Sequence, residues 1–492
     1  MLNKSIWENN HKTNNIKFKN EIPTKTDILI IGGGITGVTT AYLLKNSNLS
    51  VTIIDKSKIG MGITANSTAK ISYLQETIYQ DLEKSFSRQV AKLYFDSQLE
   101  AIKIINNIIK KENIDCDFEK VDSILFTTDK TNIHKLKKEK EILESFDVKC
   151  RDIDKLPIDF PIYNGFVVDE TYQMNPIKYT RNLAKIIKND INIVENVKAL
   201  NIRLNDGKYV TKTDVGNIIS KYVITTCHYP FFTFPGLIPI KNHIEREYVN
   251  ASKYPISKHF TAINIDSNLH SIRFYKDYLI YGSTNQLLTN KIDYEKEYQK
   301  SKDEFKKYFN VEPEYTWTNQ DLITGDYLPF IGNPNKKQPN LYVATGYNAW
   351  GMTNSIVAAK LISDLIQEKK NPYINLFSPH RKNISLVGNS LLNCIYYAKI
   401  YLQTYLTRNH SFYPDSVKVT KINGKYYGIY IDKDNIKHIV KNKCPHLKCN
   451  LVFNNEEKTW DCPCHGSRFT IDGDVLEGPT TYSIRTNDHE TL

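Results

Sequence analysis

The sequence predicts an α/β domain interrupted by an α+β domain and followed by a small all-β domain. Three observations predict this architecture. Near the N-terminus, an apolar run of strand character leads into a glycine-rich turn and then a helix. In the middle of the chain, strand-like and helix-like segments alternate irregularly, which favours a doubly wound domain interrupted by a second one. Near the C-terminus, short strand-like segments flank two loops that carry cysteine and histidine.

The N-terminal turn, residues 32–37, has the spacing G-x-G-x-x-G. Gly32 allows a tight turn, Gly34 lets the backbone approach a pyrophosphate, and Gly37 lets the helix pack closely on the strand. Asp55 ends the next strand and can accept hydrogen bonds from ribose hydroxyls. With a strand before it, a helix after it and an acid about twenty residues on, the turn predicts a Rossmann-like dinucleotide site. A glycine-rich turn of no consequence is the alternative.

Two further segments indicate which dinucleotide is bound. Residues 60–70 (GMGITANSTAK) and the strand-turn-helix at residues 341–353 (LYVATGYNAWGMT) resemble the D-amino-acid oxidase-like FAD oxidoreductases. The resemblance extends over about residues 7–381 and implies FAD, with the N-terminal amides of the last helix placed against the flavin ring. Such amides stabilise the negative charge of the reduced ring. The implied FAD-binding residues are Gly32, Gly34, Gly37, Asp55, Lys56, Thr68, Ala69, Val197, Gly346, Trp350, Gly351, Met352 and Thr353.

The C-terminal loops read Cys444-x-His446 and Cys462-x-x-His465. One cysteine and one histidine from each loop can hold a [2Fe-2S] cluster, with one iron on sulfur and the other on nitrogen. A structural zinc site also uses two cysteines and two histidines, but zinc fingers usually begin C-x2-4-C and end H-x3-5-H. A purely structural set of disulfides is the third alternative, and it leaves both histidines unexplained.

Residues 411–492 resemble the Rieske iron-sulfur domain of the cytochrome bc1/b6f type. The resemblance implies that Cys444, His446, Cys462 and His465 bind the cluster. It also implies a disulfide between the remaining pair, Cys449 and Cys464. Such a bond is in tension with a cytoplasmic location, although a bridge beside a cluster can be shielded from reduction.

One residue departs from the Rieske pattern. The family often has Ser-x-Tyr after the second loop, with the tyrosine hydroxyl bonded to a cluster cysteine, whereas this chain has Ser467-Arg468-Phe469. The resemblance implies that Ser467 still donates to a cluster sulfur. A missing donor leaves more charge on the sulfurs, so we expect a reduction potential below the upper range of the family.

Charge and hydropathy limit the classes of partner. The net charge is +11, but the lysines are spread evenly and no nucleic-acid motif is present, so we expect a solvated basic surface and no nucleic acid. Residues 1–26 are polar and resemble no signal peptide, and no stretch is long and apolar enough to span a membrane. These features predict a cytoplasmic protein. Residues 384–406 predict an amphipathic linker helix, whose tyrosine-rich face either packs on the flavin domain or contacts a membrane surface peripherally.

The domain organisation follows from these motifs. We expect an α/β Rossmann-like FAD-binding domain with an inserted α+β substrate domain, then an all-β Rieske domain. The predicted ranges are 1–75 (FAD-binding), 76–175 (mainly substrate), 176–236 (FAD-binding), 237–325 (substrate), 326–381 (FAD-binding), 382–410 (linker helix) and 411–492 (Rieske).

Candidates for the substrate site are fewer. Arg246, Tyr248 and Arg273 lie on strands expected to face the flavin, where an arginine can clamp a carboxylate in bidentate fashion. A surface or sheet-edge role explains each of them equally well. Residues 285–290 depart from relatives that carry an attached Rieske domain, so the resemblance names no substrate.

Together the motifs predict an FAD-dependent oxidoreductase. It oxidises a small amine or amino-acid-like substrate, with one-electron transfer between the flavin and the cluster. His446 and His465 are expected to be exposed enough to meet a redox-protein or quinone-type partner. The alternative is a non-catalytic flavin and iron-sulfur adaptor for a respiratory or oxygenase partner. A Rieske oxygenase needs a further mononuclear iron on two histidines and a carboxylate, and no such set stands out.

Overall fold

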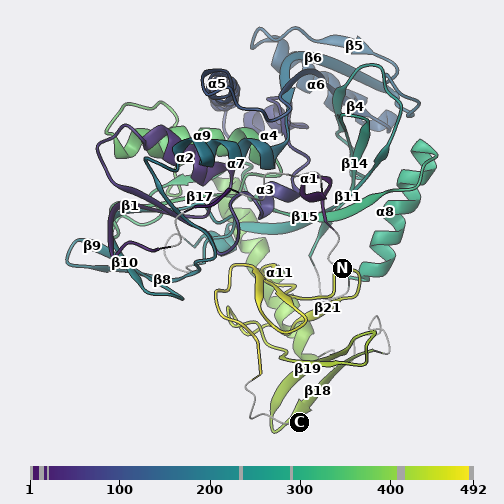
Figure 1. Ribbon diagram of the computed structural model, residues 1–492. Helices are drawn as coiled ribbons and strands as arrows, with labels where there is room; N and C mark the ends of the chain where they lie inside the picture. The colour runs from purple at the N-terminus through teal and green to yellow at the C-terminus, as the bar shows by residue number, and fades with distance from the viewer. Residues whose placement is uncertain are drawn as a thin grey trace.

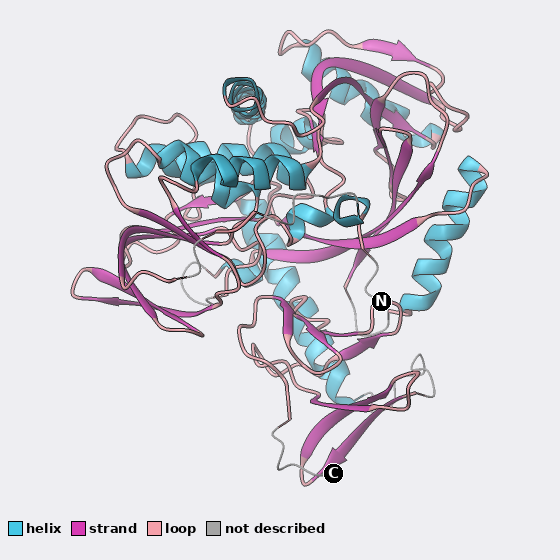
Figure 2. Cartoon of the chain, in the orientation of Figure 1, coloured by secondary structure: helices cyan, strands magenta, loops and turns pink. Residues whose placement is uncertain are grey.

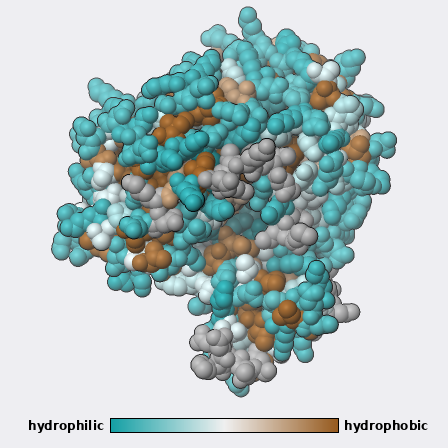
Figure 3. Space-filling view, viewed as in Figure 1, coloured by the Kyte–Doolittle hydropathy of each residue, from teal (hydrophilic) through white to brown (hydrophobic). Residues whose placement is uncertain are grey.

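The computed structural model describes residues 4–9, 16–18, 21–231, 237–288, 292–406 and 416–486. A large upper body contains two sheets with their helices, and a smaller β domain projects below it (Figures 1 and 2). The face seen in Figure 3 is largely hydrophilic, with a hydrophobic patch where the upper body meets the lower domain. The predicted domain boundaries at residues 236 and 410 lie outside the described residues, as do residues 289 and 290.

The first sheet contains the predicted dinucleotide fold. Its strands are β1 (Lys25–Ile31), β2 (Val51–Ile54), β7 (Asn192–Val194), β8 (Ala199–Asn205), β9 (Lys208–Thr213), β10 (Asn217–Thr225), β16 (Phe330–Gly332) and β17 (Leu341–Thr345). Its central order is β16-β17-β10-β1-β2-β7, and β1 pairs in parallel with both β2 and β10. Residues 191–226 form four strands, of which β8 and β9 make a hairpin.

The second sheet forms the inserted domain. Its strands are β3 (Lys70–Ile71), β4 (Glu119–Thr127), β5 (Arg151–Ile153), β6 (Asn164–Gln173), β11 (Asn242–Lys253), β12 (Phe260–Asn264), β13 (His270–Tyr275), β14 (Tyr278–Leu287) and β15 (Tyr315–Thr324). Strand β11 lies between β14 and β15 and pairs antiparallel with both. Segments distant in sequence are therefore brought to one sheet, which lies beside the nucleotide-binding sheet.

Helices cover the sheets and connect the domains. They are α1 (Ile6–Asn9), α2 (Ile35–Leu44), α3 (Ile63–Asn66), α4 (Ile78–Ser85), α5 (Arg88–Lys111), α6 (Ile133–Glu144), α7 (Pro176–Ile187), α8 (Tyr294–Phe309), α9 (Gly351–Ile366), α10 (Ile374–Phe377) and α11 (Ile384–Leu406). Local chemistry sets several ends. Asn175 caps α7 by accepting from the Lys178 amide, and Pro176 occupies the first turn. Asp293 caps α8, which ends at Asn310 in the left-handed region.

The lower domain contains two small antiparallel sheets. One is made of β18 (Val417–Ile422), β19 (Lys425–Ile431) and β20 (Lys437–Lys441), and the other of β21 (Val452–Asn454), β22 (Thr459–Asp461), β23 (Arg468–Thr470) and β24 (Val475–Glu477). Helix α11 runs from the upper body into this domain (Figure 1). Its Ile400 belongs to the apolar core of the lower domain, together with Trp460 and Phe469. No described helix is both long enough and apolar enough to cross a bilayer.

Candidate functional site

The turn between β1 and α2 has no room for side chains. Gly32 has φ +113°, and a Cβ there would lie 2.7 Å from the carbonyl oxygen of Thr226. A Cβ on Gly37 would lie 2.0 Å from the carbonyl oxygen of Gly32. Gly34 precedes α2, and no side chain caps that helix, so its first amides are left for a phosphate. The turn fits the pyrophosphate of FAD.

Asp55 lies beside this turn at the end of β2. Its Oδ2 accepts a hydrogen bond from the Gly33 amide at 2.7 Å, and its Oδ1 accepts one from the Ser57 amide at 2.8 Å. Burial raises the pKa of this carboxyl. The Val197 amide donates to the Asp55 carbonyl at 2.8 Å, which brings another predicted residue to the same place. The side chain of Lys56 instead reaches a main-chain carbonyl of the lower domain.

The start of α9 lies against a cavity. Trp350 and Met352 line this cavity together with Thr68. The helix has no side-chain cap, so its first amides can face an electron-rich ring. Gly346 has φ +72°. Thr353 accepts a hydrogen bond from the Gln75 side chain at 3.3 Å, so its hydroxyl already holds part of the surrounding polar network.

Four charged side chains line the same cavity, and the sequence did not single them out. They are Lys70 on β3, Glu76, Glu247 on β11 and Asp321 on β15. Burial lowers the pKa of Lys70 to about 8. Burial and the charges of Glu247 and Glu245 raise the pKa of Asp321 to about 8. Burial and the charge of Glu245 raise the pKa of Glu76 to about 7. The cavity is therefore rich in carboxyl groups that repel one another.

The alternation of side chains along β11 and β15 indicates the faces on which Glu247 and Asp321 lie. Along β11, Glu245 and Glu247 alternate with Arg246 and Tyr248, so the two sets lie on opposite faces of the sheet. Only one set can face the flavin. The register pairs Glu245 with Asp321, which places these two acids on one face.

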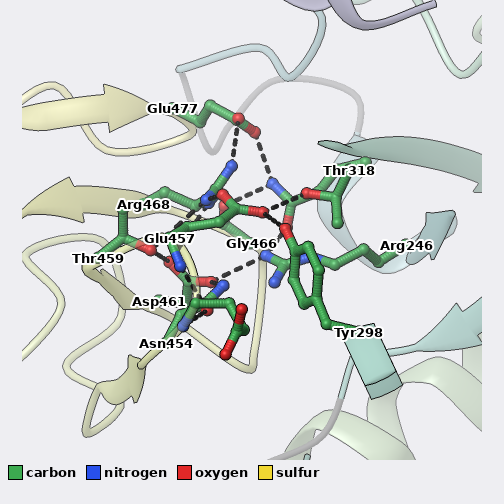
Figure 4. A network of polar contacts seen from close by, with 12 residues as sticks. Arg246, Tyr298, Thr318, Asn454, Glu457, Thr459, Asp461, Gly466, Arg468 and Glu477 are labelled. Atoms are coloured by element: carbon green, nitrogen blue, oxygen red, sulfur yellow. Dashed lines mark hydrogen bonds and ion pairs between the residues drawn. The ribbon is translucent and has the colours of Figure 1, made fainter. Parts of the chain in front are cut away.

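The arginine and tyrosine candidates lie elsewhere. The described residues that line the cavity do not include Arg246, Tyr248 or Arg273. Tyr248 packs edge-on against Tyr298 of α8, with ring centroids 5.0 Å apart. Arg246 projects from the same face of β11 toward the lower domain (Figure 4).

The guanidinium of Arg273 donates hydrogen bonds to main-chain carbonyls. It donates to the carbonyls of Thr68 and Ala69, the latter at 2.8 Å, and to that of Met174 at 2.9 Å. Its guanidinium lies 4.9 Å from the ring of Trp7. Arg273 therefore holds the predicted FAD-binding segment in place through both terminal nitrogens of its guanidinium, while its Nε is buried without a hydrogen-bond partner among the described residues.

The four predicted cluster ligands meet between two loops of the lower domain. Hydrogen bonds from Cys462, the His446 amide and the Ser467 hydroxyl lower the pKa of the Cys444 thiol against the effect of burial. The rings of His446 and His465 lie 4.9 Å apart. The Nδ1 atom of His465 is buried and has no hydrogen-bond partner among the described residues. Such a nitrogen is satisfied when it binds a metal, so the donor set fits a [2Fe-2S] cluster.

A disulfide joins Cys449 and Cys464, which the resemblance to the Rieske domain implied. The sulfur of Cys462 lies within 4.8 Å of both disulfide sulfurs. The two bonded cysteines have no thiolate to offer a metal. The sulfur ligands available at this place are therefore Cys444 and Cys462, both free and buried.

The expectation of two exposed histidines is wrong for His465. Its side chain is buried, with 4% of the residue exposed, because the upper body covers the second loop. The ring of Tyr397 on α11 lies 4.6 Å from the His465 ring, and that of Tyr229 lies 6.4 Å away. His446 is only partly covered. The cluster site therefore faces the upper body on one side and is more accessible on the other.

Buried polar contacts join the lower domain to β11 and β15 (Figure 4). Arg246 donates to Asp461 of β22 at 2.9 Å, and both side chains are almost completely buried. Gln320 of β15 donates to the carbonyl of Gly466 at 3.2 Å and to Glu477 of β24 at 2.5 Å.

A second set of contacts lies beside them. Glu457 accepts hydrogen bonds from Thr318 of β15, at 2.5 Å, and from Tyr298 of α8. Arg468 bonds to both Glu457 and Glu477, so the carboxyl groups at this interface have cationic partners. These contacts bring the cluster loops against the face of β11 and β15 that lies opposite the cavity.

Comparisons with known proteins agree with this geometry. Residues 27–365 match the family described as FAD dependent oxidoreductase, and residues 404–488 match the Rieske [2Fe-2S] domain. The chain is 31% identical over 484 residues to the Bacillus subtilis (strain 168) protein YhfW, whose name describes it as a Rieske 2Fe-2S iron-sulfur protein, with 94% of each chain covered. It is 23% identical to gamma-glutamylputrescine oxidoreductase of Escherichia coli (strain K12), covering 72% of this chain and 87% of the relative.

Solved structures share the fold of the upper body. An L-amino acid deaminase from Proteus vulgaris superposes with a TM-score of 0.60 at 17% identity, covering 75% of this chain and 97% of the other. Glycine oxidase from Geobacillus kaustophilus gives a TM-score of 0.59 at 15% identity, covering 73% and 100%. The chain therefore belongs to the FAD dependent oxidoreductase family, with a Rieske [2Fe-2S] domain at its C-terminus, and it binds both FAD and a [2Fe-2S] cluster.

Proposed function

We propose that this enzyme oxidises a small, positively charged amine, and that electrons pass singly between its flavin and its Rieske cluster. The observation that supports this most is the charge of the cavity beside Trp350. Glu76, Glu247 and Asp321 line it, whereas no arginine is among its described lining residues. Burial and mutual repulsion raise the pKa of Asp321 and Glu76, and an ammonium group placed among these carboxyls relieves the repulsion. A substrate carboxylate would add to that repulsion, with only Lys70 to oppose it.

The protein's own groups have defined tasks in this reaction. When bound, the flavin supplies two-electron oxidation and the cluster supplies one-electron transfer. Glu247 and Asp321 attract and orient the substrate ammonium. Asn319 donates to Oδ2 of Asp321 at 2.9 Å, which fixes the orientation of this carboxyl. With a pKa of about 8, the Asp321 carboxyl keeps its own proton in the empty cavity near neutral pH, so it accepts the ammonium proton only after the bound cation has favoured its ionised form.

The two redox sites lie on opposite faces of β11 and β15. Glu247 and Asp321 face the cavity, while Arg246 and Gln320 hold the domain that carries the cluster ligands. We propose that electrons cross at this interface and leave on the side of His446, the less covered histidine. A redox protein or a quinone-type carrier would receive them there. The relative from Escherichia coli is named for gamma-glutamylputrescine, a substrate name that agrees with an amine.

Anaerobic flavin bleaching tests the proposal. The purified holoprotein is mixed without oxygen with monoamines, diamines and amino acids, and the flavin absorbance is followed beside the electron paramagnetic resonance signal of the cluster. We expect at least one cationic amine to bleach the flavin and to reduce the cluster afterwards. In the Asp321→Asn variant, bleaching should be slowed about tenfold or more. Asp206→Asn, which changes an exposed turn residue, is the matched control and should behave like the wild type. If no amine bleaches the flavin, the chain is the non-catalytic adaptor instead.

A further inference from the structure

Helix α11 presents two different faces. Its inner face packs on the protein. Leu386 and Ile400 are buried, while the hydroxyls of Tyr396 and Tyr397 donate to the main-chain carbonyls of Leu288 and Asn242. Its outer face is a stripe of large aliphatic side chains that are between 59% and 91% exposed. The stripe consists of Ile384, Val387, Leu391, Leu392, Ile395 and Leu402.

The spacing shows that this stripe is continuous. From Ile384 the residues follow at positions +3, +7, +8, +11 and +18, which keeps them on one side of an α-helix. Leu386, Asn393 and Ile400 occupy the opposite side and are buried. Single exposed apolar residues are ordinary on a protein surface, but an aliphatic stripe along a whole helix marks a binding face.

Charge indicates what covers the stripe. Residues 369–414 contain no aspartate or glutamate, although the chain as a whole has 54. Lys382 and Lys399 are exposed beside the stripe. A second copy of the chain would bring like charges together with no carboxylate on this segment to pair with them. An anionic lipid surface offers both an apolar layer and the opposite charge.

We propose that the outer face of α11 binds the surface of an anionic membrane, with the helix lying in the interface. This face lies across one helix from the cluster site, because Tyr397 on the inner side contacts the ring of His465. A lipid-soluble electron carrier is then the partner that this placement favours. That last step rests on the proposed function, whereas membrane binding itself does not.

Vesicle flotation of the full-length holoprotein tests the proposal. The probes are phosphatidylcholine vesicles with and without about one third phosphatidylglycerol, at low and at physiological salt. We expect the wild type to float with the anionic vesicles, less so at higher salt, and to stay behind with the neutral ones. The Leu391→Gln, Ile395→Gln double variant should bind about tenfold more weakly. Ile436→Gln is the matched control, because Ile436 is 56% exposed on the lower domain, and it should bind like the wild type.

Three results would overturn the proposal. The first is no difference between anionic and neutral vesicles. The second is a double variant that floats like the wild type. The third is a dimer in light scattering that the double variant makes monomeric while the wild type ignores vesicles, which would assign the stripe to a second copy. None of these readouts uses amine turnover, so the proposal can fail while the proposed function stands, and the reverse also holds.

Discussion

The carboxyl groups of the cavity affect the stability of the fold as well as the proposed binding of a cationic substrate. Asp321 is buried and lies among Glu247 and Glu245, so in the folded state it keeps a proton up to a pKa of about 8, far above the ordinary aspartate value near 3.9. Between these two values the unfolded chain has lost a proton that the folded chain still holds. The contribution of Asp321 to stability is therefore full below about pH 4 and is lost as the pH rises through about 8.

We predict that Asp321→Asn stabilises the substrate-free protein at alkaline pH. The amide cannot ionise, so the cost of keeping a buried acid near other acids disappears. The melting temperature of the variant should exceed that of the wild type by about 2–4 °C at pH 8.5, and the difference should shrink or reverse at pH 5. Differential scanning calorimetry across this range measures it. An identical difference at both pH values would show that the cavity acids do not titrate as described.

Phe469 is the residue at which the cluster site departs from its family. It is fully buried in the same apolar core as Cys444 and Cys462. We predict that Phe469→Tyr raises the reduction potential of the cluster, because a new hydroxyl can donate to a cluster sulfur. One neutral hydrogen bond contributes about 1 kcal/mol, which corresponds to about 40 mV for one electron. Redox titration monitored by electron paramagnetic resonance measures the reduction potential of the cluster. An unchanged potential would show that residue 469 does not reach the sulfurs.

At the scale of elements, the paired strands β11 and β15 separate the cavity beside Trp350 from the loops that carry the predicted cluster ligands. The alternation of side chains puts Glu247 and Asp321 toward the cavity and Arg246 and Gln320 toward the lower domain. One face of these strands therefore presents carboxyl groups to the cavity, and the other face presents hydrogen-bond donors to the lower domain.

We predict that Glu247→Gln weakens binding of a cationic substrate about tenfold without changing the docking of the lower domain. A charge-assisted hydrogen bond contributes roughly 1.5–3 kcal/mol, and part of it survives in the amide. The measurement is the KM for the amine found by flavin bleaching, compared with kcat. A fall in kcat with unchanged KM would assign Glu247 to the chemical step instead of to binding.

The same strands show where sequence reasoning succeeded and where it stopped. The predicted strand and helix on either side of the glycine-rich turn correspond to β1 and α2, and the predicted linker helix at residues 384–406 corresponds to α11. Hydrophobic periodicity and capping residues determine such elements locally. The sequence did not determine which face of β11 points toward the cavity. Glu245 and Glu247 form one polar set and Arg246 and Tyr248 form another, so either set could face inward. Only the docked lower domain, which supplies Asp461 to Arg246, decides between them.

The nucleotide turn and the cluster loops were predictable for a different reason. Gly32 and Gly37 occupy positions where a Cβ has no space, and Cys444 and His446 stand at a spacing that metal binding requires. Local sequence carries such constraints. The burial of His465 depends on how two domains meet, and no pattern within its own loop records that contact.

At the scale of the whole molecule, the lower domain packs against the upper body and is not merely connected to it by the chain. An apolar cluster crosses the boundary, with Tyr229 of the upper body and Val452 of the lower domain among its members. Polar contacts surround it, and Arg246 contributes a guanidinium that lies 4.9 Å from the ring of Tyr294 as well as 2.9 Å from Asp461. Since both partners of this ion pair are buried, its loss is more costly than that of a surface pair.

We predict that Arg246→Met releases the lower domain from the upper body while each part stays folded. Methionine keeps much of the volume but removes the cation that β11 contributes to Asp461, and breaking a buried pair costs about 3–5 kcal/mol. Asp461 still has Arg468 at 3.3 Å, so the fold of the lower domain should survive and the loss should fall on docking. Small-angle scattering should show a larger radius of gyration, and electron transfer from reduced flavin to the cluster should slow at least tenfold. The control is Arg485→Met, which breaks an exposed pair with Asp474 inside the lower domain and should change neither quantity. An unchanged radius with slowed transfer would mean that Arg246 tunes the electron path without holding the domains together.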